Sequence, residues 1–423
     1  MSSISVLKFG GTSVKNIGRI NHVVDIIAKN KTAKQIVVVS AMGDTTDYLY
    51  GLAKQCSSAP DRRELDMLLS TGEQISIALL TIILKDRGIK AKSFTGSQIG
   101  IVTDNTHSCA RILDISASAL KEALRENDVL VVAGFQGLSE SGEITTLGRG
   151  GSDTSAVALA AATGAGDCHI YTDVDGIFTS DPNQVQDTSL IETLSYSETI
   201  ELARAGAQVL HPRAAELARH YGIKLRVRNT FNPDNVGTLI SGARTVEKPS
   251  KVKAVAVDSH QAYVLLTNVP SEYPILAECE RLFEQEDVSI DVVSQTNLND
   301  EECLVQLALK YNDAELLQNI LQQLQTKSGA EDLTVDTDVT RISLIGSGIG
   351  SASQIRTKAL GLLTSACIQV RLFSSSESTI SFLVNSEHAK RAADLLHHEF
   401  LGVQRVSSTY RHNQHQPLRE TAN

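Results

Sequence analysis

The sequence lacks the features typical of nucleic-acid-binding proteins and of proteins stabilised by zinc or disulfides. Its 423 residues contain no block of Lys and Arg and carry a formal net charge of −10, which argues against nucleic-acid binding because phosphate contacts need a basic face. The six cysteines have no C-x-x-C spacing, so neither a structural zinc site nor a disulfide framework is expected. We interpret them as reduced thiols at positions 56, 109, 168, 279, 303 and 367.

Long hydrophobic runs are also missing. The longest run, IALLTIIL at 77–84, is far too short to cross a bilayer, and the N-terminus has no apolar segment typical of a signal peptide. We therefore expect a cytoplasmic protein without a membrane partner. With 42% hydrophobic and 21% charged residues, a chain of this length can bury the cores of two or three domains.

Short β-branched runs alternate with helical patterns through the first half of the chain. This alternation predicts a mainly parallel sheet covered by helices on both faces. Ligands bind beyond the carboxyl ends of the strands in such a sheet, and the glycine-rich stretches at 10–11, 134–137 and 148–151 fall near those ends. The predicted strands are 5–9, 35–40, 90–94, 129–135, 168–172 and 224–229, and the predicted helices are 17–29, 65–86, 114–126, 152–163 and 197–220.

The second half of the chain repeats itself at an offset of about 80 residues, where VSIDVVSQT at 288–296 matches IQVRLFSSS at 368–376. Each copy is preceded by an apolar helical stripe and followed by a short strand and a polar helix. This pattern predicts two β-α-β-β-α units. The stripes are Leu276, Cys279 and Phe283 in the first copy and Ile355, Ala359 and Leu362 in the second.

The polar segment 241–253 has no hydrophobic periodicity and predicts a linker. We expect an N-terminal domain at 1–243, a linker at 244–252, repeated modules at 253–335 and 336–410, and a disordered tail at 411–423.

LGRGGSD at 147–153 is a glycine-rich loop directly before an alanine-rich helix. One interpretation is a helix start capped by Ser152 or Asp153. The other is an anion site, because KFGGTS at 8–13 is a second Gly-Gly turn after a strand, and glycine lets backbone N–H groups approach a phosphate closely. Neither stretch has the Walker A or G-x-G-x-x-G spacing, which excludes those two phosphate-binding motifs.

Three charged residues are candidates for ligand binding. Lys8 either faces water or lies buried in its apolar strand, where an ammonium needs an anionic partner such as phosphate. Glu73 either completes a capping box with Ser70 or lies in the interior, where it would hold a substrate ammonium. Arg149 carries a planar guanidinium that suits a carboxylate or a phosphate.

YTDVDGIFTSDP at 171–182 gathers Asp173, Asp175 and Asp181 after a predicted strand. The spacing of a calcium-binding loop is absent, so we expect no metal site in the protein, and tight turns are the alternative to a ligand site. The pair His211-Pro212 predicts a helix start rather than a metal site.

Together these stretches resemble the aspartate kinase family. The resemblance covers residues 4–240 as a kinase domain and 253–410 as two ACT-type regulatory modules. It rests on six motifs in order: KFGGTSV at 8–14, VVSAMGDTTDYL at 38–49, STGEQIS at 70–76, VAGFQG at 132–137, TLGRGGSDTSAVALA at 146–160 and YTDVDGIFTSDP.

The resemblance implies the amino-acid-kinase fold, an αβα sandwich, followed by ferredoxin-like ACT modules. It implies a monofunctional enzyme that transfers the γ-phosphoryl group of ATP to the β-carboxylate of L-aspartate, with Mg²⁺ arriving on ATP. The products would be ADP and 4-phospho-L-aspartate, in the first step of lysine, threonine and methionine biosynthesis. Because the acceptor is already an anion, catalysis would need positioning and charge neutralisation but no general base.

The resemblance also implies roles for individual residues. Lys8 would stabilise charge on the transferring phosphoryl group, and Asp153 would orient this lysine or organise the metal–phosphate region. Glu73 would bind the α-ammonium of aspartate and Arg149 a carboxylate. The implied aspartate site comprises Ser40, Thr46, Glu73, Arg149 and Ser152, and the implied ATP site comprises Lys8, Gly10, Gly11, Thr12, Thr172, Asp173, Phe178 and Asp181.

Two positions depart from the family pattern. Asn183 and Gln208 stand where some members have an arginine and a lysine near the nucleotide. Fewer cations there would weaken ATP binding or increase the reliance on Mg²⁺. We still expect an active enzyme because the core positions are present.

The paired ACT modules imply an allosteric sensor for an end-product amino acid, lysine or threonine, in a homodimer or homotetramer. Its contacts would be Ser289, Asp291 and Thr296, unless these residues only stabilise turns. The turn SQTNLNDEE at 294–302 departs from common patterns, which leaves the identity of the effector open.

Two other functions compete with this interpretation. One is an amino-acid kinase that acts on glutamate, acetylglutamate, a nucleotide or carbamate, against which the STGE helix and the ACT pair argue. The other is a catalytically silent amino-acid sensor. The retention of Lys8, Glu73, Arg149 and Asp153 argues against a silent protein.

Overall fold

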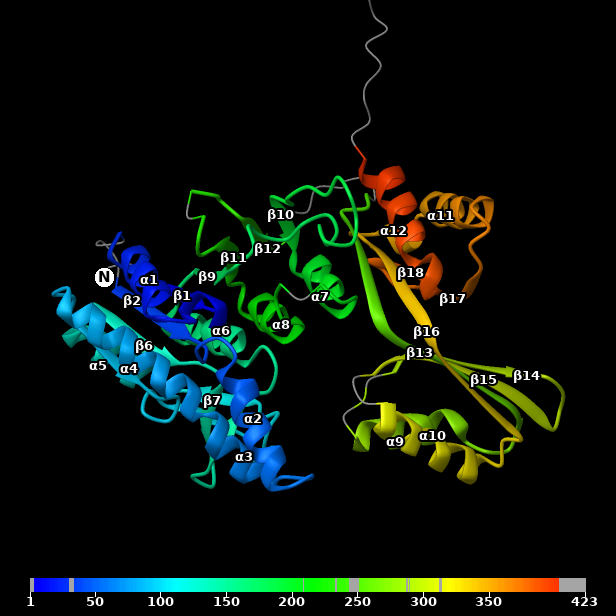
Figure 1. Cartoon of the computed structure of the whole chain (residues 1–423), viewed down its shortest axis with the longest axis horizontal. Coiled ribbons are helices and arrows are strands. Elements are labelled where there is room, and N and C mark those ends of the chain that lie inside the picture. The colour runs from blue at the N-terminus through cyan, green and yellow to red at the C-terminus, as the bar shows by residue number, and fades with distance from the viewer. Residues whose placement is uncertain are drawn as a thin grey trace, which may run out of the picture.

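An N-terminal α/β domain and a C-terminal α+β region lie side by side in the computed structural model (Figure 1). The structure describes residues 4–29, 34–207, 209–232, 234–242, 251–286, 288, 290–311 and 314–402. The expected tail at 411–423 and most of the expected linker at 244–252 lie outside the described residues.

The main sheet of the N-terminal domain confirms the predicted parallel architecture. Its eight strands have the order β10-β12-β11-β9-β1-β2-β6-β3, and every adjacent pair is parallel except β11 with β12. The strands are β1 Ile4–Phe9, β2 Lys34–Val39, β3 Ala91–Phe94, β6 Val129–Ala133, β9 Asp167–Thr172, β10 Thr193–Ser195, β11 Lys224–Asn229 and β12 Thr238–Ser241.

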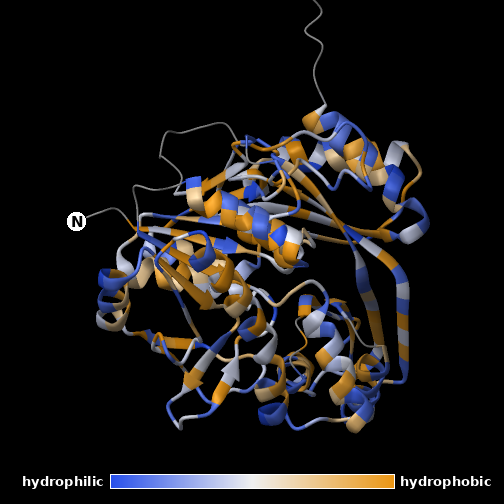
Figure 2. Cartoon of the chain, turned by 60° about the vertical axis from the view of Figure 1, so that its left-hand side comes forward, coloured by the Kyte–Doolittle hydropathy of each residue, from blue (hydrophilic) through white to orange (hydrophobic). Residues whose placement is uncertain are grey.

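Helices cover both faces of this sheet, because alternate strand residues point to opposite faces. Val6 of β1 packs with α6 on one face, and Leu7 and Phe9 pack with α1 and α4 on the other. The central strands are apolar and buried between these helices (Figure 2). The helices are α1 Ile17–Lys29, α4 Thr71–Asp86, α5 Ala117–Glu126, α6 Gly151–Thr163, α7 Tyr196–Arg204 and α8 Pro212–Tyr221, with a short 3-10 helix, η1, at Gly11–Val14.

A second, four-stranded sheet was not anticipated from the sequence. It has the order β5-β4-β7-β8, with β4 Ile101–Thr103, β5 Ile112–Ile115, β7 Gln136–Ser139 and β8 Ile144–Thr146. The helix predicted at 114–126 begins only at Ala117, because β5 occupies the preceding residues and Ser116 caps the helix by accepting from the N–H of Ala119. These strands are too short to show a clear alternation of apolar and polar residues.

Two other predicted helices are each divided in the structure. The helix predicted at 65–86 consists of α3 Arg62–Leu69 and α4, which meet at Ser70. The helix predicted at 197–220 consists of α7 and α8, because Gly206 has a φ of +106° and Pro212 lies in the first turn of α8. Helix α2, Thr45–Cys56, lies beside α3 (Figure 1).

The helical stretch Arg62–Asp86 is long and apolar enough to cross a membrane by length and composition alone, among the residues that the structure describes. Half of its most apolar window is buried within the protein, and α4 packs on β3 and β6. This placement is that of a core helix in the N-terminal domain.

The C-terminal region is one six-stranded sheet of order β14-β15-β13-β16-β18-β17, with helices packed against it. The predicted strands and helices of both repeats are present, except that Leu276 of the first stripe is exposed and Ile275 is buried in its place. The elements are β13 Ala254–Pro270, α9 Ile275–Gln285, β14 Ile290–Asn297, β15 Glu302–Lys310, α10 Ala314–Ser328, β16 Asp332–Ile345, α11 Ser353–Ser365, β17 Val370–Ser375, β18 Thr379–Asn385 and α12 Ser386–Leu401.

Strands β13 and β16 run through both repeats. The first part of β13 pairs with the last part of β16 beside β18, and the last part of β13 pairs with the first part of β16 beside β15. The expected boundary between 335 and 336 therefore falls inside β16.

Helix α7 joins the two regions. Arg341 of β16 donates through Nη2 to the carbonyl oxygen of Arg204, at 2.9 Å, and Thr379 donates to the Glu201 carboxylate at 2.8 Å. The buried Glu198 carboxylate accepts from Lys253 Nζ at 3.1 Å, and its pKa is lowered by hydrogen bonds and by this cation, although burial opposes the shift.

Candidate active site

The glycine turns predicted from the sequence meet at the carboxyl edge of the main sheet. The N–H of Gly10 donates to the carbonyl oxygen of Tyr171 at 3.2 Å, so the end of β1 lies beside the end of β9. The N–H of Ser40 donates to the carbonyl oxygen of Phe9 at 3.2 Å, so the end of β2 lies on the other side of β1. Three strand ends therefore surround the Gly10-Gly11 turn.

Lys8 and Asp153 form a buried ion pair at this edge. Lys8 Nζ lies 2.6 Å from Asp153 Oδ1, and the two side chains are 12% and 11% exposed, so the possibility that Lys8 faces water is wrong. Lys8 has the same parity as Val6 on β1 and therefore points to the face that α6 covers. The first turn of α6 supplies the carboxylate that the buried ammonium requires.

The backbone of the glycine loop before α6 lies too close to its neighbours for a side chain at Gly150. Gly150 is the N-cap residue, with a φ of +70°, and a Cβ atom there would lie 2.1 Å from the Cβ of His211. Ser152 and Asp153 are therefore not the N-cap residues that one interpretation of the sequence expected. They lie within the first turn of α6, and both are buried.

His211 caps α8 and lies against this loop, as the predicted helix start requires. Burial lowers the pKa of His211, while the charge of Asp153 raises it and that of Arg149 lowers it by a smaller amount. Arg149 itself is exposed and makes no hydrogen bond or ion pair within the described part of the chain.

Glu73 is interior, as the second interpretation of its helix predicted. Its side chain is 3% exposed, Oε1 accepts from the N–H of Ala41 at 2.9 Å, and Oε2 has no partner among the described residues. The capping box is wrong, because Ser70 makes no side-chain capping bond and its hydroxyl donates to the carbonyl oxygen of Met67. Burial raises the pKa of Glu73 to about 7, although the hydrogen bond from Ala41 opposes the shift.

The structure brings eight of the sequence-predicted residues together around the end of β1. Ser40 follows β2, next to Ala41, which binds Glu73. Thr46 lies in the first turn of α2, close to this segment. The eight residues are Lys8, Gly10, Gly11, Ser40, Glu73, Ser152, Asp153 and Thr172. Thr12 lies in η1, directly after the turn, and Arg19 Nη1 donates to its carbonyl oxygen.

The predicted nucleotide segment is partly separate from this group. Thr172 ends β9, and its hydroxyl donates to Asp173 Oδ1 at 3.2 Å. Phe178 forms an isolated bridge with Leu190. Asp181 is exposed and accepts from the backbone and side-chain nitrogens of Asn183 at 2.9 and 3.0 Å. Asn183 thus binds a neighbouring carboxylate in this structure.

The predicted effector residues are only partly described. Asp291 of β14 forms an ion pair with Arg341 at 2.6 Å, and Thr296 lies farther along the same strand, by roughly 16 Å at about 3.3 Å per residue. Ser289 and Gln208 lie outside the described residues. Within the described ranges, no group of three or more His, Cys, Asp or Glu side chains is placed to hold a metal ion.

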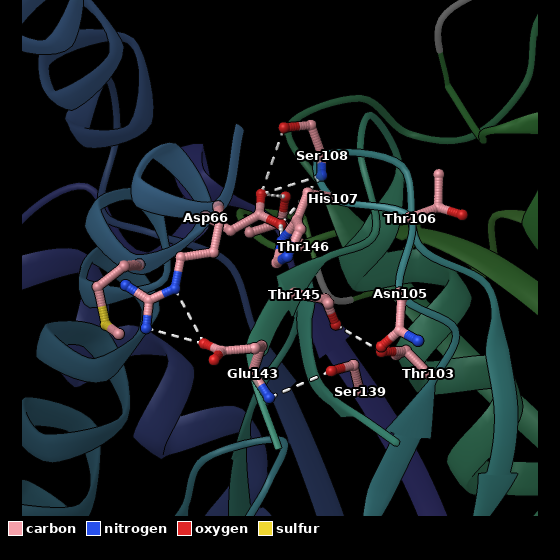
Figure 3. A network of polar contacts seen from close by, with 12 residues as sticks. Asp66, Thr103, Asn105, Thr106, His107, Ser108, Ser139, Glu143, Thr145 and Thr146 are labelled. Atoms are coloured by element: carbon pink, nitrogen blue, oxygen red, sulfur yellow. Dashed lines mark hydrogen bonds and ion pairs between the residues drawn. The ribbon is translucent and has the colours of Figure 1, made fainter. Parts of the chain in front are cut away.

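The sequence analysis missed Asp66. This carboxylate is fully buried in α3 and accepts hydrogen bonds from Thr146 and Ser108 beside the glycine loop (Figure 3). One signal was available: Asp66 occupies the same helical stripe as Leu69 and Glu73, where an unpaired carboxylate would be costly.

The parallel sheet, the glycine turns at its carboxyl edge and the buried lysine–carboxylate pair are the features of a phosphoryl-transfer enzyme of the amino-acid-kinase class. The model of the amino acid kinase family matches residues 3–229, and that of an ACT domain matches residues 342–400. The chain is 41% identical to the aspartokinase of Geobacillus stearothermophilus over 399 residues, which is 94% of this chain and 97% of that protein.

Solved structures agree with this relationship. E. coli aspartokinase III in complex with aspartate and ADP (R-state) matches with a TM-score of 0.78 and 26% identity, over 93% of this chain and 99% of that one. The complex of the same enzyme with lysine and aspartate (T-state) matches with a TM-score of 0.73 and 26% identity, over 95% and 100%. The chain belongs to the aspartokinase family and is a kinase whose phosphoryl acceptor is a carboxyl group.

The raised pKa of Glu73 predicts a pH-dependent cost to stability. The carboxyl group has a pKa of about 7 in the folded state against 4.5 as its ordinary value, so below pH 4.5 it is neutral in both states and costs nothing. As pH rises towards 7, the unfolded state ionises first and the folded state loses stability relative to it. We expect Glu73→Gln to be more stable than the natural protein at pH 8, by about 3 kcal/mol, and equally stable near pH 4. Urea unfolding at both pH values measures this, and a gap independent of pH would contradict it.

Proposed function

We propose that this kinase phosphorylates the β-carboxylate of L-aspartate with the γ-phosphoryl group of ATP. The observation that carries the proposal is the unpartnered oxygen of Glu73, a buried carboxylate beside the ends of β1 and β2. A substrate ammonium would satisfy this oxygen and would favour the ionised form of Glu73. The aspartate and ADP bound to E. coli aspartokinase III support the same choice of substrate.

The proposed aspartate site has a cationic and an anionic side. Glu73 binds the α-ammonium, and the guanidinium of Arg149 binds a carboxylate with its planar fork. Ser40, Thr46 and Ser152 are the remaining proposed contacts. Support for this arrangement comes from the hydrogen-bonding capacity that Glu73 Oε2 and the exposed Arg149 guanidinium leave unused within the described part of the chain.

The proposed reaction needs no general base, because the acceptor is already ionised. A β-carboxylate oxygen forms a bond to the γ-phosphorus, the bond from this phosphorus to the bridging oxygen breaks, and ADP leaves with that electron pair. Lys8 neutralises charge that develops on the transferring group, and Asp153 holds the Lys8 ammonium in place.

Nucleotide would bind as MgATP at the Gly10-Gly11 turn, on the side away from the proposed aspartate contacts. Backbone N–H groups of Gly11 and Thr12 would contact phosphate oxygens, as glycine-rich turns at helix starts do. Gly10, whose N–H binds the carbonyl oxygen of Tyr171, would line the same phosphate site. The further proposed contacts are Thr172, Asp173, Phe178 and Asp181.

We also propose that an end-product amino acid, lysine or threonine, inhibits the enzyme at Ser289, Asp291 and Thr296. Because Asp291 and Thr296 lie roughly 16 Å apart on one strand, one effector molecule would contact them from two copies of the chain. The ACT-domain match and the lysine bound to E. coli aspartokinase III support regulation of this kind. The proposal includes a homodimer or homotetramer, a cytoplasmic location and a place at the start of lysine, threonine and methionine biosynthesis.

A comparison of acceptors tests the proposed substrate. With MgATP, we expect ADP production that depends on L-aspartate and is absent with L-glutamate or acetylglutamate. A coupled ADP assay measures the rates. Activity with glutamate alone would overturn the proposal.

Substitution of Lys8 tests the proposed catalytic role. Lys8→Met keeps the length of the side chain but removes the charge, and we expect turnover to fall by roughly 10²–10³-fold, the usual effect of losing one charge-stabilising donor. Asp153→Asn should lower turnover in the same direction. Circular dichroism checks that both variants are folded, and near-normal turnover in both would contradict the assigned roles.

Removal of the Asp291 carboxylate tests the proposed effector site. We expect Asp291→Asn to weaken inhibition by the effector amino acid, because the acceptor for its ammonium loses its charge. Lysine, threonine and methionine are added singly and in pairs to the aspartate assay. Asp336→Asn is the matched control, since Asp336 forms an ion pair of 2.5 Å with Arg371 in the same sheet and should keep both activity and inhibition. If the effector amino acid inhibits Asp291→Asn and Asp336→Asn to the same extent, it does not bind at Asp291.

A further inference from the structure

Asp66 is a charged residue in the interior that the proposed chemistry does not use. Its side chain is fully buried in α3, and within the described residues no Lys or Arg pairs with it. Burial of a carboxylate is costly unless hydrogen bonds replace the lost water. The groups that donate these hydrogen bonds therefore indicate the role of Asp66.

Those groups come from two segments, one with Thr146 and the other with His107 and Ser108 (Figure 3). Thr146 Oγ1 donates to Asp66 Oδ1 at 2.5 Å, and the N–H of Ser108 donates to both carboxylate oxygens at 3.1 and 3.0 Å. His107 Nδ1 lies 2.8 Å from Asp66 Oδ2. One carboxylate thus holds the end of β8 and the loop between β4 and β5.

Both of these segments contact the loop that carries Arg149. Thr146 is the last residue of β8, three positions before Arg149. Ser108 has a φ of +67°, and a Cβ atom at Gly148 would lie 3.1 Å from its carbonyl oxygen. Any displacement of Ser108 or Thr146 would therefore move the glycine loop.

Arg213 also binds both of these segments. Its guanidinium donates to the carbonyl oxygens of Leu147 at 2.8 Å and Ala110 at 2.6 Å. Because Asp66 binds Thr146 and Arg213 binds Leu147, the backbone before Arg149 is fixed, although the Arg149 side chain has no partner within the described part of the chain.

The helix that carries Asp66 leads directly to Glu73. The two carboxylates lie on the buried side of α3 and α4, seven residues apart, which corresponds to about 10 Å along a helix. The junction between these helices is itself fixed, because Gln136 Nε2 donates to the carbonyl oxygen of Ser70 at 2.8 Å. Asp66 therefore links the element that presents Glu73 to the loop that presents Arg149.

We propose that Asp66, acting through Thr146 and Ser108, is a positioning residue that sets the separation between Glu73 and Arg149 for the amino-acid substrate. This inference rests on the proposed function, in which those two side chains bind the ammonium and a carboxylate. The nucleotide side of the site does not depend on Asp66. Lys8 lies on β1, Gly10 in the turn that follows, and Thr172 at the end of β9. None of them forms a hydrogen bond or ion pair with Asp66. Loss of the link should therefore weaken aspartate binding and spare MgATP binding.

Two neighbouring threonines provide a matched test. Thr146→Val removes the hydroxyl that binds Asp66, and we expect the KM for aspartate to rise about tenfold, as for a lost hydrogen bond to a charged group, while the KM for MgATP stays within about twofold. Thr145→Val is the control, because Thr145 is equally buried but its hydroxyl lies 2.5 Å from that of Thr103. We expect this control to lower the melting temperature and leave both KM values unchanged. Thr146→Ser keeps the hydroxyl and should restore the natural KM for aspartate.

His107→Ala is a milder second variant, since His107 is partly exposed and supplies only one contact to Asp66. We expect a smaller rise in the KM for aspartate, about threefold, with no change for MgATP. If Thr146→Val does not fold, this variant decides the question. Equal KM values for aspartate in Thr146→Val and Thr145→Val, or no rise in His107→Ala, would overturn the inference while leaving the proposed function intact. Failure of the natural enzyme to use aspartate would overturn both.

Discussion

The N-terminal domain is organised around the need of one buried ammonium for an anion. Lys8 lies in an apolar strand between two helical layers, where an unpaired charge would be too costly to keep. Asp153 satisfies it at 2.6 Å, so α6 has to begin at this point of the sheet edge. Glycine is needed just before α6, because His211 leaves no space for a side chain at Gly150. A phosphate that approaches the same edge meets a cation already held in place.

Six of the eight strands of the main sheet were predicted, most clearly β2 and β6, which are short β-branched runs buried on both faces, whereas the short strands β10 and β12 were not predicted. The small sheet could not be predicted, because strands of three or four residues such as β4 and β8 carry no periodic pattern. The helix start at Pro212 was indicated by the pair His211-Pro212, but the end of the preceding helix near 206 was missed for a different reason. Apolar residues continue through this segment, whereas the chain reverses at Gly206 and restarts at Pro212.

In the site, too, patterns of neighbouring residues were informative, whereas contacts between residues far apart in the chain were not predicted. The apolar neighbours of Lys8 and Glu73 offered an interior position for each as one of two alternatives, and the structure decides for that alternative in both cases. The sequence indicated phosphate as the partner of Lys8, and it could not supply the distance to Asp153, which depends on how α6 packs against β1. Asp66 was missed because its partners lie about 40 and 80 positions away along the chain, and only the fold brings Ser108 and Thr146 to it.

Strands β13 and β16 cross from one repeat to the other without a break. Each repeat therefore borrows part of its sheet from the other, and a cut near residue 335 would divide β16 and leave both with an incomplete edge. The smallest unit in this region with a complete set of strand pairings is therefore the whole six-stranded sheet rather than the single repeat that the sequence displays.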